Sequence, residues 1–152
     1  MIEGKTSLMD LALAEAKMAA ARGEVPVGAV LADGSRGEIL ARAGNRVEEL
    51  KDPTAHAEML VIRAAAAGAG LKRLEGADLY VTLEPCAMCA AAISFARLRR
   101  LYFGAGDPKG GAVDHGPRFF AQATCHHRPE VYGGIGEQAA GELLKAFFRA
   151  RR

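Results

Sequence analysis

The chain has 152 residues, of which half are hydrophobic and a quarter charged, and its formal net charge is +2. This composition predicts one folded domain over residues 1–152 and excludes both a disordered chain and binding of nucleic acid through net charge alone. An odd number of cysteines, three, disfavours a disulfide framework and favours a reducing compartment. Charges interrupt the apolar segments, so we expect no secretory signal, no membrane span and a cytoplasmic location.

The first 45 residues predict a helix and a β-hairpin. Ser7 begins a capping-box pattern that would open a helix, an apolar stripe follows it, and Gly23 would end the helix. Residues 25–31 and 38–43 are β-rich runs on either side of a glycine-containing turn, which predicts two antiparallel strands. Asn45 comes next, and without further context such an Asn is most simply a turn former.

A second helix is predicted over residues 53–67, with Asp52 or Thr54 as a possible cap. It carries His56 and Glu58 near its N-terminus. Side chains lean back toward that end of a helix, so these two can share one space although they are only two positions apart. Taken alone, a His-x-Glu triplet is common by chance and is most simply a surface pattern.

A strand, a helix and a second strand follow, over residues 78–83, 86–96 and 101–103. The first strand is almost continuously apolar, as expected of a strand covered on both faces, and the short connections predict a parallel right-handed crossover. Ligands of open α/β sheets bind beyond the carboxyl ends of parallel strands. Cys86 and Cys89, at the start of the helix, are therefore predicted to lie where a substrate can reach them.

Cys86 and Cys89 are three positions apart, so their sulfur atoms would share one helix face near amides that stabilise thiolates. Alone, the pair could be a redox pair, half of a four-cysteine zinc site or two buried thiols. Together with His56 it supplies one His and two Cys, the ligand number of a catalytic zinc ion with an open fourth position. With Glu58 as a free carboxylate, the combination is the signature of zinc-dependent nucleobase deaminases.

The last third of the chain predicts a functional glycine-rich loop over residues 104–116, a short strand at 131–132 and a terminal helix over 137–152. The triplet Cys125-His126-His127 lacks a fourth ligand, so we interpret it as structural or surface rather than as a second metal site. Cations gather in two groups, one predicted beside the metal site (Arg97, Arg99, Arg100, Lys109) and one in the last helix (Lys145, Arg149, Arg151, Arg152). The helical group could bind RNA or simply complement the helix dipole.

The chain resembles the cytidine deaminase superfamily and, within it, the bacterial tRNA-specific adenosine deaminases. The resemblance covers nearly the whole sequence and is carried by residues 24–30, 45–46, 52–58, 79–86, 88–89, 103–105, 107 and 147–149. The chain departs from the usual pattern at Gly106 and over residues 110–129, which form part of the loop expected to cover the substrate.

The resemblance implies a three-layer α/β/α cytidine deaminase-like fold, with a central mixed five-stranded sheet flanked by helices. It implies one Zn²⁺ per subunit bound by His56, Cys86 and Cys89, with Glu58 as the catalytic proton shuttle. The implied reaction is hydrolytic deamination of adenosine to inosine at the wobble position of a tRNA anticodon. A deaminase of a free base or nucleoside, such as guanine or cytosine, is the alternative; an inactive RNA-binding subunit is disfavoured by Glu58.

The resemblance also implies the partners and their contacts. Asn45 and Asp107 would bind the substrate. The anticodon arm of the tRNA would lie near the cations Lys109, Arg149, Arg151 and Arg152. The family further implies a homodimer in which the RNA sites are shared across the interface.

Overall fold

The computed structural model describes residues 2–151, with side chains described from residue 8 onward. The strands are β1 (Gly28–Asp33), β2 (Ile39–Gly44), β3 (Ala77–Leu83), β4 (Arg100–Ala105) and β5 (Glu130–Tyr132). The helices are α1 (Ile2–Ala21), α2 (Val47–Leu50), α3 (Ala57–Ala69), α4 (Ala87–Phe95) and α5 (Glu137–Arg149), with one 3-10 turn, η1 (Phe119–Ala121).

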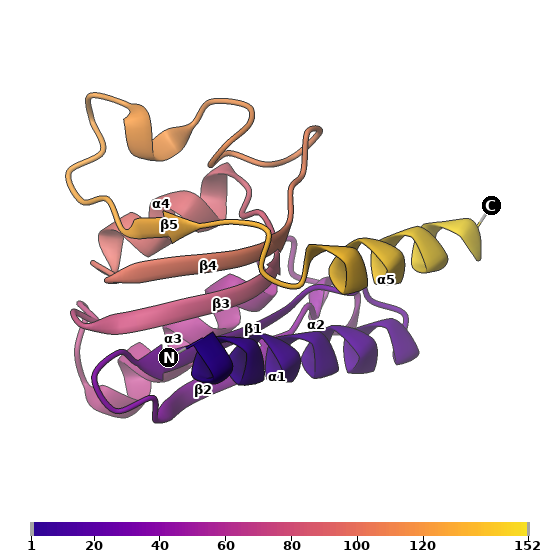
Figure 1. Ribbon diagram of the computed structural model, residues 1–152, viewed down its shortest axis with the longest axis horizontal. Helices are drawn as coiled ribbons and strands as arrows, with labels where there is room; N and C mark the ends of the chain where they lie inside the picture. Colours follow the sequence, from indigo (N-terminus) through magenta and orange to yellow (C-terminus); the bar gives the residue numbers. More distant parts are fainter. Residues whose placement is uncertain (1, 152) are drawn as a thin grey trace.

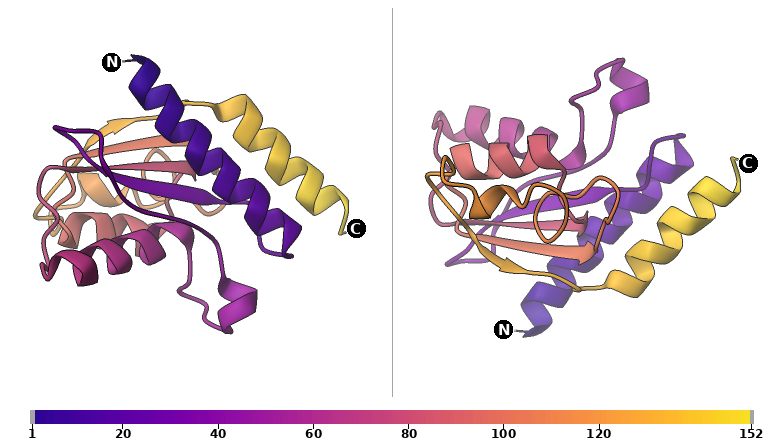
Figure 2. Two further views of the ribbon diagram at one scale, coloured as in Figure 1. Left: turned by 90° about the horizontal axis from the view of Figure 1, so that it is seen from below. Right: turned by 90° about the horizontal axis from the view of Figure 1, so that it is seen from above.

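The five strands form one mixed sheet in the order β2-β1-β3-β4-β5. β1 pairs antiparallel with β2 and β3, whereas β3, β4 and β5 run parallel to one another. α1 and α5 cover one face of the sheet, and α3 and α4 cover the other (Figures 1 and 2). The predicted hairpin, crossover and three-layer mixed sheet are confirmed.

Alternate side chains of the strands pack into two hydrophobic cores, one on each face of the sheet. Leu79 and Val81 join the core beneath α3 and α4, while Tyr80 joins the core beneath α1 and α5. Tyr80 stacks on Tyr102 of the neighbouring strand, with ring centroids 4.5 Å apart. Gly28 lets α1 approach β1, because a Cβ there would lie 2.0 Å from a backbone oxygen of α1. The close packing fixes the sheet between its helices.

Two predicted helix starts are wrong. α1 begins at Ile2, so Ser7 lies inside the helix rather than at its cap. The helix can extend this far because residues 2–6 contain no proline and only one glycine. α3 begins at Ala57 rather than at residue 53. Its upstream segment is instead a turn, because Asp52 Oδ1 accepts hydrogen bonds from the backbone N–H and the hydroxyl of Thr54. This turn places His56 at the N-cap of the helix.

The prediction that Arg97, Arg99 and Arg100 lie beside the metal site is also wrong. Arg99 forms a bidentate ion pair with Asp78 at the start of β3, with N–O distances of 2.9 and 2.7 Å. The metal-binding segment follows Leu83, five strand positions further on, which is roughly 17 Å away. These arginines therefore support the opposite end of the sheet.

In the triplet at residues 125–127, Cys125 and His127 make structural contacts and His126 is exposed. The buried Cys125 thiol donates to the backbone oxygen of His127 at 3.1 Å, and the His127 ring bonds to the backbone oxygen of Leu98 at 2.6 Å. These bonds pin the segment before β5 to the end of α4. No described helix combines the length and apolarity that crossing a bilayer requires.

Candidate metal centre and substrate pocket

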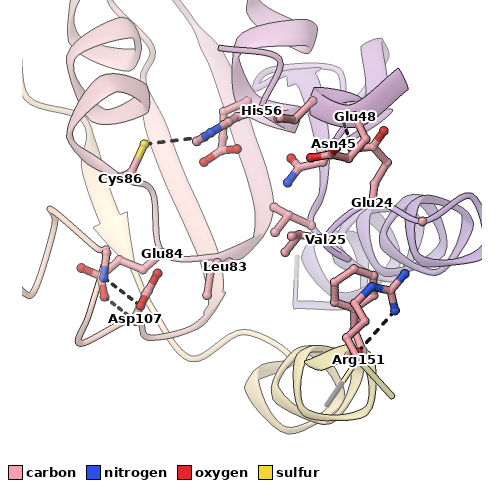
Figure 3. Close-up of a pocket in the computed structure, with 16 residues that line it drawn as sticks. Glu24, Val25, Asn45, Glu48, His56, Leu83, Glu84, Cys86, Asp107 and Arg151 are labelled. Atoms are coloured by element: carbon pink, nitrogen blue, oxygen red, sulfur yellow. Dashed lines mark hydrogen bonds between the residues drawn. The ribbon is translucent and has the colours of Figure 1, made fainter. Parts of the chain in front are cut away.

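Two helices begin at the metal centre. His56 is the N-cap residue of α3 and Cys86 that of α4, both with extended backbone torsions. Cys89 lies in the first turn of α4 and is buried. Because α4 follows directly on β3, the site lies beyond the carboxyl ends of the parallel strands, as predicted. Figure 3 shows His56 and Cys86 pointing toward one another.

The spacing of the three donor atoms fits zinc. His56 Nδ1 lies 3.6 Å from Cys86 Sγ and 3.5 Å from Cys89 Sγ. Tetrahedral zinc, with Zn–N near 2.0–2.1 Å and Zn–S near 2.3 Å, separates nitrogen from sulfur by about 3.6 Å. Within residues 8–151, no other cluster of His, Cys, Asp and Glu has metal-binding geometry. The structure thus brings the three predicted ligands together with room for one ion.

The hydrogen bond between Cys86 and Cys89 shifts the pKa of both thiols. The Cys89 thiol donates to Cys86 and, with the His56 ring, lowers the pKa of Cys86 to about 4 although burial opposes this. The same hydrogen bond, reinforced by burial, raises the pKa of Cys89. Metal binding needs the thiolate form, so the lowered pKa of Cys86 favours a divalent ion at this site.

Glu58 is a buried carboxylate beside the metal triad. It lies in the first turn of α3, two residues after His56, and both residues line the same pocket. Burial raises the pKa of Glu58 to about 7, although the His56 ring pulls it down. The described metal cluster does not include Glu58. Its place next to the metal and outside the ligand set is the one that proton transfer requires.

Asn45 combines two roles that the sequence presented as alternatives. Its Oδ1 accepts a 2.8 Å hydrogen bond from the backbone N–H of Ala57, so it holds the first turn of the helix that carries His56. It also lines the pocket, next to the metal triad. The residue is therefore more than a turn former: it ties the pocket wall to the metal-binding helix.

The pocket beside the metal has a volume of about 720 Å³. Asp107 lines it and lies beside Glu84, below Cys86 in the view of Figure 3. Phe147 and Arg151 of the C-terminal segment close the opposite side, where the Arg151 guanidinium lies 3.5 Å above the centre of the Phe147 ring. The pocket is thus bounded by α5 as well as by the metal-binding helices.

A second cavity of about 830 Å³ adjoins the pocket, and the two share the lining residues Val25, Leu83, Asp107 and Gly110. Lys109, Lys145 and Arg149 line this cavity, which we call the cationic groove. Of the predicted RNA-binding cations, Lys109 and Arg149 thus lie in the groove and Arg151 in the pocket. Arg152 lies outside the described residues.

Sequence reasoning missed two buried glutamates that shape the pocket. Glu24 accepts hydrogen bonds from the backbone N–H groups of Glu48 and Glu49, at 3.0 and 2.8 Å, and so fixes α2. Glu84 does the same for the glycine-rich loop. Burial alone would raise the pKa of Glu84, but its hydrogen bonds, first that from the Asp107 N–H, hold the pKa below its usual value. For Glu84, its place directly before Pro85-Cys86 was the one sequence feature that could have indicated a role at the site.

The profile of the cytidine and deoxycytidylate deaminase zinc-binding region matches residues 2–105. A tRNA-specific adenosine deaminase of Agrobacterium fabrum is 62% identical over 148 residues, covering 97% of this chain and 96% of that protein. This chain belongs to the cytidine deaminase superfamily, among the tRNA-specific adenosine deaminases. The resemblance found in the sequence is confirmed, and with it zinc as the cofactor, for which the triad is the candidate site.

Other relatives agree with this deaminase family. A tRNA-specific adenosine deaminase of Bacillus subtilis is 49% identical over 144 residues, covering 95% of this chain and 88% of that protein. A solved structure from a study of A-to-I editing by tRNA deaminases at the wobble position superposes with a TM-score of 0.89 at 62% identity, covering 91% and 99% of the two chains. A guanine deaminase of Nitrosomonas europaea shares the fold alone, at 22% identity, a TM-score of 0.80 and coverage of 93% and 83%.

Proposed function

We propose that this deaminase hydrolyses adenosine to inosine at the wobble position of a tRNA anticodon. The observation that carries the proposal is a pair of adjoining cavities: the pocket holds the metal triad and the free carboxylate, and the cationic groove shares four lining residues with it. The names of the relatives at 62% and 49% identity support the same substrate. A free base would need only the pocket at the metal triad, whereas a groove lined by Lys109, Lys145 and Arg149 suits RNA phosphates.

The reaction exchanges the C6–N6 bond of adenine for a C6–O bond, consumes one water molecule and releases ammonia. His56, Cys86 and Cys89 would hold a zinc ion, which when bound would lower the pKa of water to about 7 and so supply a nucleophile at neutral pH. Glu58 takes the proton that this water loses and delivers it to N1 of the ring. Glu58 then carries the hydroxyl proton of the C6 adduct to the departing amine. One carboxylate thus performs both proton transfers.

The remaining pocket residues bind and orient the nucleotide. Asn45, fixed by its bond to Ala57, would present its amide group to the base, and Asp107 would contact the nucleotide from the opposite wall. An anticodon loop already presents unstacked bases, so the enzyme avoids much of the few kcal/mol that extraction from a duplex costs.

The test is to incubate the purified protein with an anticodon hairpin that carries adenosine at the wobble position and to quantify inosine. A hairpin with guanosine at that position, free adenosine, guanine and cytosine serve as controls. We expect inosine from the adenosine hairpin alone. Turnover of a free base with no reaction on the hairpin would contradict the proposal and support the alternative deaminase.

We further propose that the enzyme works as a homodimer in the cytoplasm, where its RNA substrate is found. The family resemblance supports the dimer, and Phe95, 78% exposed on α4, together with Leu71, 58% exposed after α3, offers apolar surface for it. Sedimentation equilibrium tests this point. A monomer at micromolar concentration would contradict the dimer without affecting the proposed reaction.

A further inference from the structure

A single buried carboxylate organises the loop that joins the pocket to the cationic groove. The Glu84 side chain is fully buried, directly after β3 and two residues before Cys86. Its Oε2 accepts the backbone N–H groups of Val113, Asp114 and His115 at 3.0, 2.9 and 3.1 Å. Its Oε1 accepts the N–H of Asp107 at 2.9 Å and bonds to His115 Nδ1 at 2.7 Å. Both ends of the loop over residues 106–116 thus depend on one side chain.

The loop is shaped to receive this carboxylate. A Cβ at Gly111 would lie 2.4 Å from Glu84 Oε2, so the loop can close around the carboxylate only with glycine at this position. No lysine or arginine pairs with Glu84 among the described residues, and its charge is compensated by loop N–H groups and the His115 ring. The loop and its acceptor therefore form a matched unit.

The part of the loop that faces the cavity follows from the Glu84 bond to Asp107. Asp107 Oδ1 in turn accepts the N–H groups of Lys109 and Gly110, at 3.2 and 3.0 Å, which closes a tight turn. This turn supplies Asp107 and Gly110 to the pocket and the groove, and Lys109 to the groove. All described side-chain hydrogen bonds of Glu84 go to the loop and none to a metal ligand.

We propose that Glu84 is a positioning residue for RNA: by fixing the loop over residues 106–116 it sets the affinity for the anticodon arm and leaves the chemical step unchanged. The inference rests on the proposed function. The competing explanation is purely structural, because the N–H of Ala112 also donates to the backbone oxygen of Pro85 at 2.9 Å, next to Cys86. A loop that mainly supports Cys86 would affect zinc binding and turnover, whereas a positioning loop affects RNA binding.

Two variants disturb the contact from opposite sides. In Glu84→Gln, an NH₂ donor replaces one oxygen, so at least one loop N–H that donates to Glu84 loses its acceptor. Gly111→Ala leaves Glu84 and its neighbours unchanged but places a methyl group against the carboxylate. Gly68→Ala is the matched control, because a Cβ at Gly68 meets no atom within 4 Å.

The experiment measures zinc content, kcat and KM on the adenosine hairpin, and amide hydrogen exchange over residues 106–116, all in the full-length protein. For Glu84→Gln and Gly111→Ala we expect one zinc per chain, KM raised about tenfold, kcat within about threefold of wild type and faster loop exchange. Gly68→Ala should match wild type in every readout.

Gly111→Ala decides the outcome. A KM within about twofold of wild type overturns the proposal, and so does a loss of zinc or a fall in kcat as large as the rise in KM. A wild-type enzyme that makes no inosine contradicts the proposed function instead. In that case unchanged loop exchange in Glu84→Gln and Gly111→Ala still overturns the positioning role.

Discussion

The pocket at the metal triad, here the metal end, and the cationic groove, the groove end, are built in different ways. At the metal end, His56 and Cys86 stand at helix N-caps, Cys89 and Glu58 are buried, and backbone geometry fixes each donor. At the groove end, exposed cations on α5 and on the loop face a wide cavity. Buried, fixed groups suit chemistry, where small displacements cost rate, and exposed charges suit recognition of a phosphate backbone. Changes at the metal end should therefore lower kcat, and changes at the groove end should raise KM.

Loss of a metal ligand should have the largest effect. Cys89→Ser leaves the zinc ion short of a thiolate, so we expect zinc content to fall well below one per chain and turnover to become undetectable. Cys125→Ser is the matched control, because Cys125 is equally buried but hydrogen-bonds to His127 rather than to the triad. Elemental analysis and inosine formation check both variants. Full activity of Cys89→Ser would exclude Cys89 as a ligand.

Glu58→Ala should have the next largest effect. A general acid and base contributes about 10²–10⁴-fold, so kcat should fall by that factor while zinc content stays at one per chain. KM should change little, because the groove is untouched. Glu58→Gln, which keeps the shape of the side chain, should lose as much turnover. Normal turnover in either variant would remove Glu58 from the mechanism.

Neutralising the groove should act on KM alone. The triple change Lys109→Gln, Lys145→Gln and Arg149→Gln should raise KM about tenfold and flatten the dependence of log KM on log salt by up to about two units. It spares Arg151, which stacks on Phe147. The matched control neutralises three exposed cations outside the cavity: Arg36, Lys72 and Arg73. An equal effect of both triples would show that only net charge matters.

Asn45 should give the smallest effect and separate its two roles. Asn45→Ala leaves the N–H of Ala57 without its acceptor and should lower the free energy of unfolding by about 1–2 kcal/mol, measured by denaturant titration. Asn45→Asp keeps an oxygen for that N–H but loses the amide donor, so stability should be preserved while KM for the hairpin rises. A fully active Asn45→Asp would reduce Asn45 to a helix cap.

The sequence was most informative where chemistry restricts the residue types. Zinc binding and proton transfer require particular side chains at particular spacings, so His56, Glu58, Cys86 and Cys89 could be predicted and are found together. The hairpin and the parallel crossover could be predicted from β-rich runs and the short connections between them, whereas the order of the strands in the sheet could not. The start of α3 was misplaced, since the Asp52 turn is as compatible with the sequence as a helix cap.

Residues whose role depends on distant partners could not be predicted. Glutamate is usually a surface residue, so nothing in the sequence marks Glu24 and Glu84 as buried. They accept hydrogen bonds from backbone N–H groups of α2 and of the glycine-rich loop, which lie about 23 to 31 positions away in the sequence. Arg99 was placed at the active site because it follows the cysteine helix in sequence. In the fold, α4 carries the chain away from the metal, and β4 returns to that end only at Ala105.

The most direct test of the metal centre is X-ray absorption at the zinc edge of the purified protein. Two sulfur neighbours at about 2.3 Å and nitrogen or oxygen neighbours at about 2.0–2.2 Å are expected from Cys86, Cys89 and His56. A third sulfur neighbour, or a protein without stoichiometric zinc, would contradict the site on which the whole account depends.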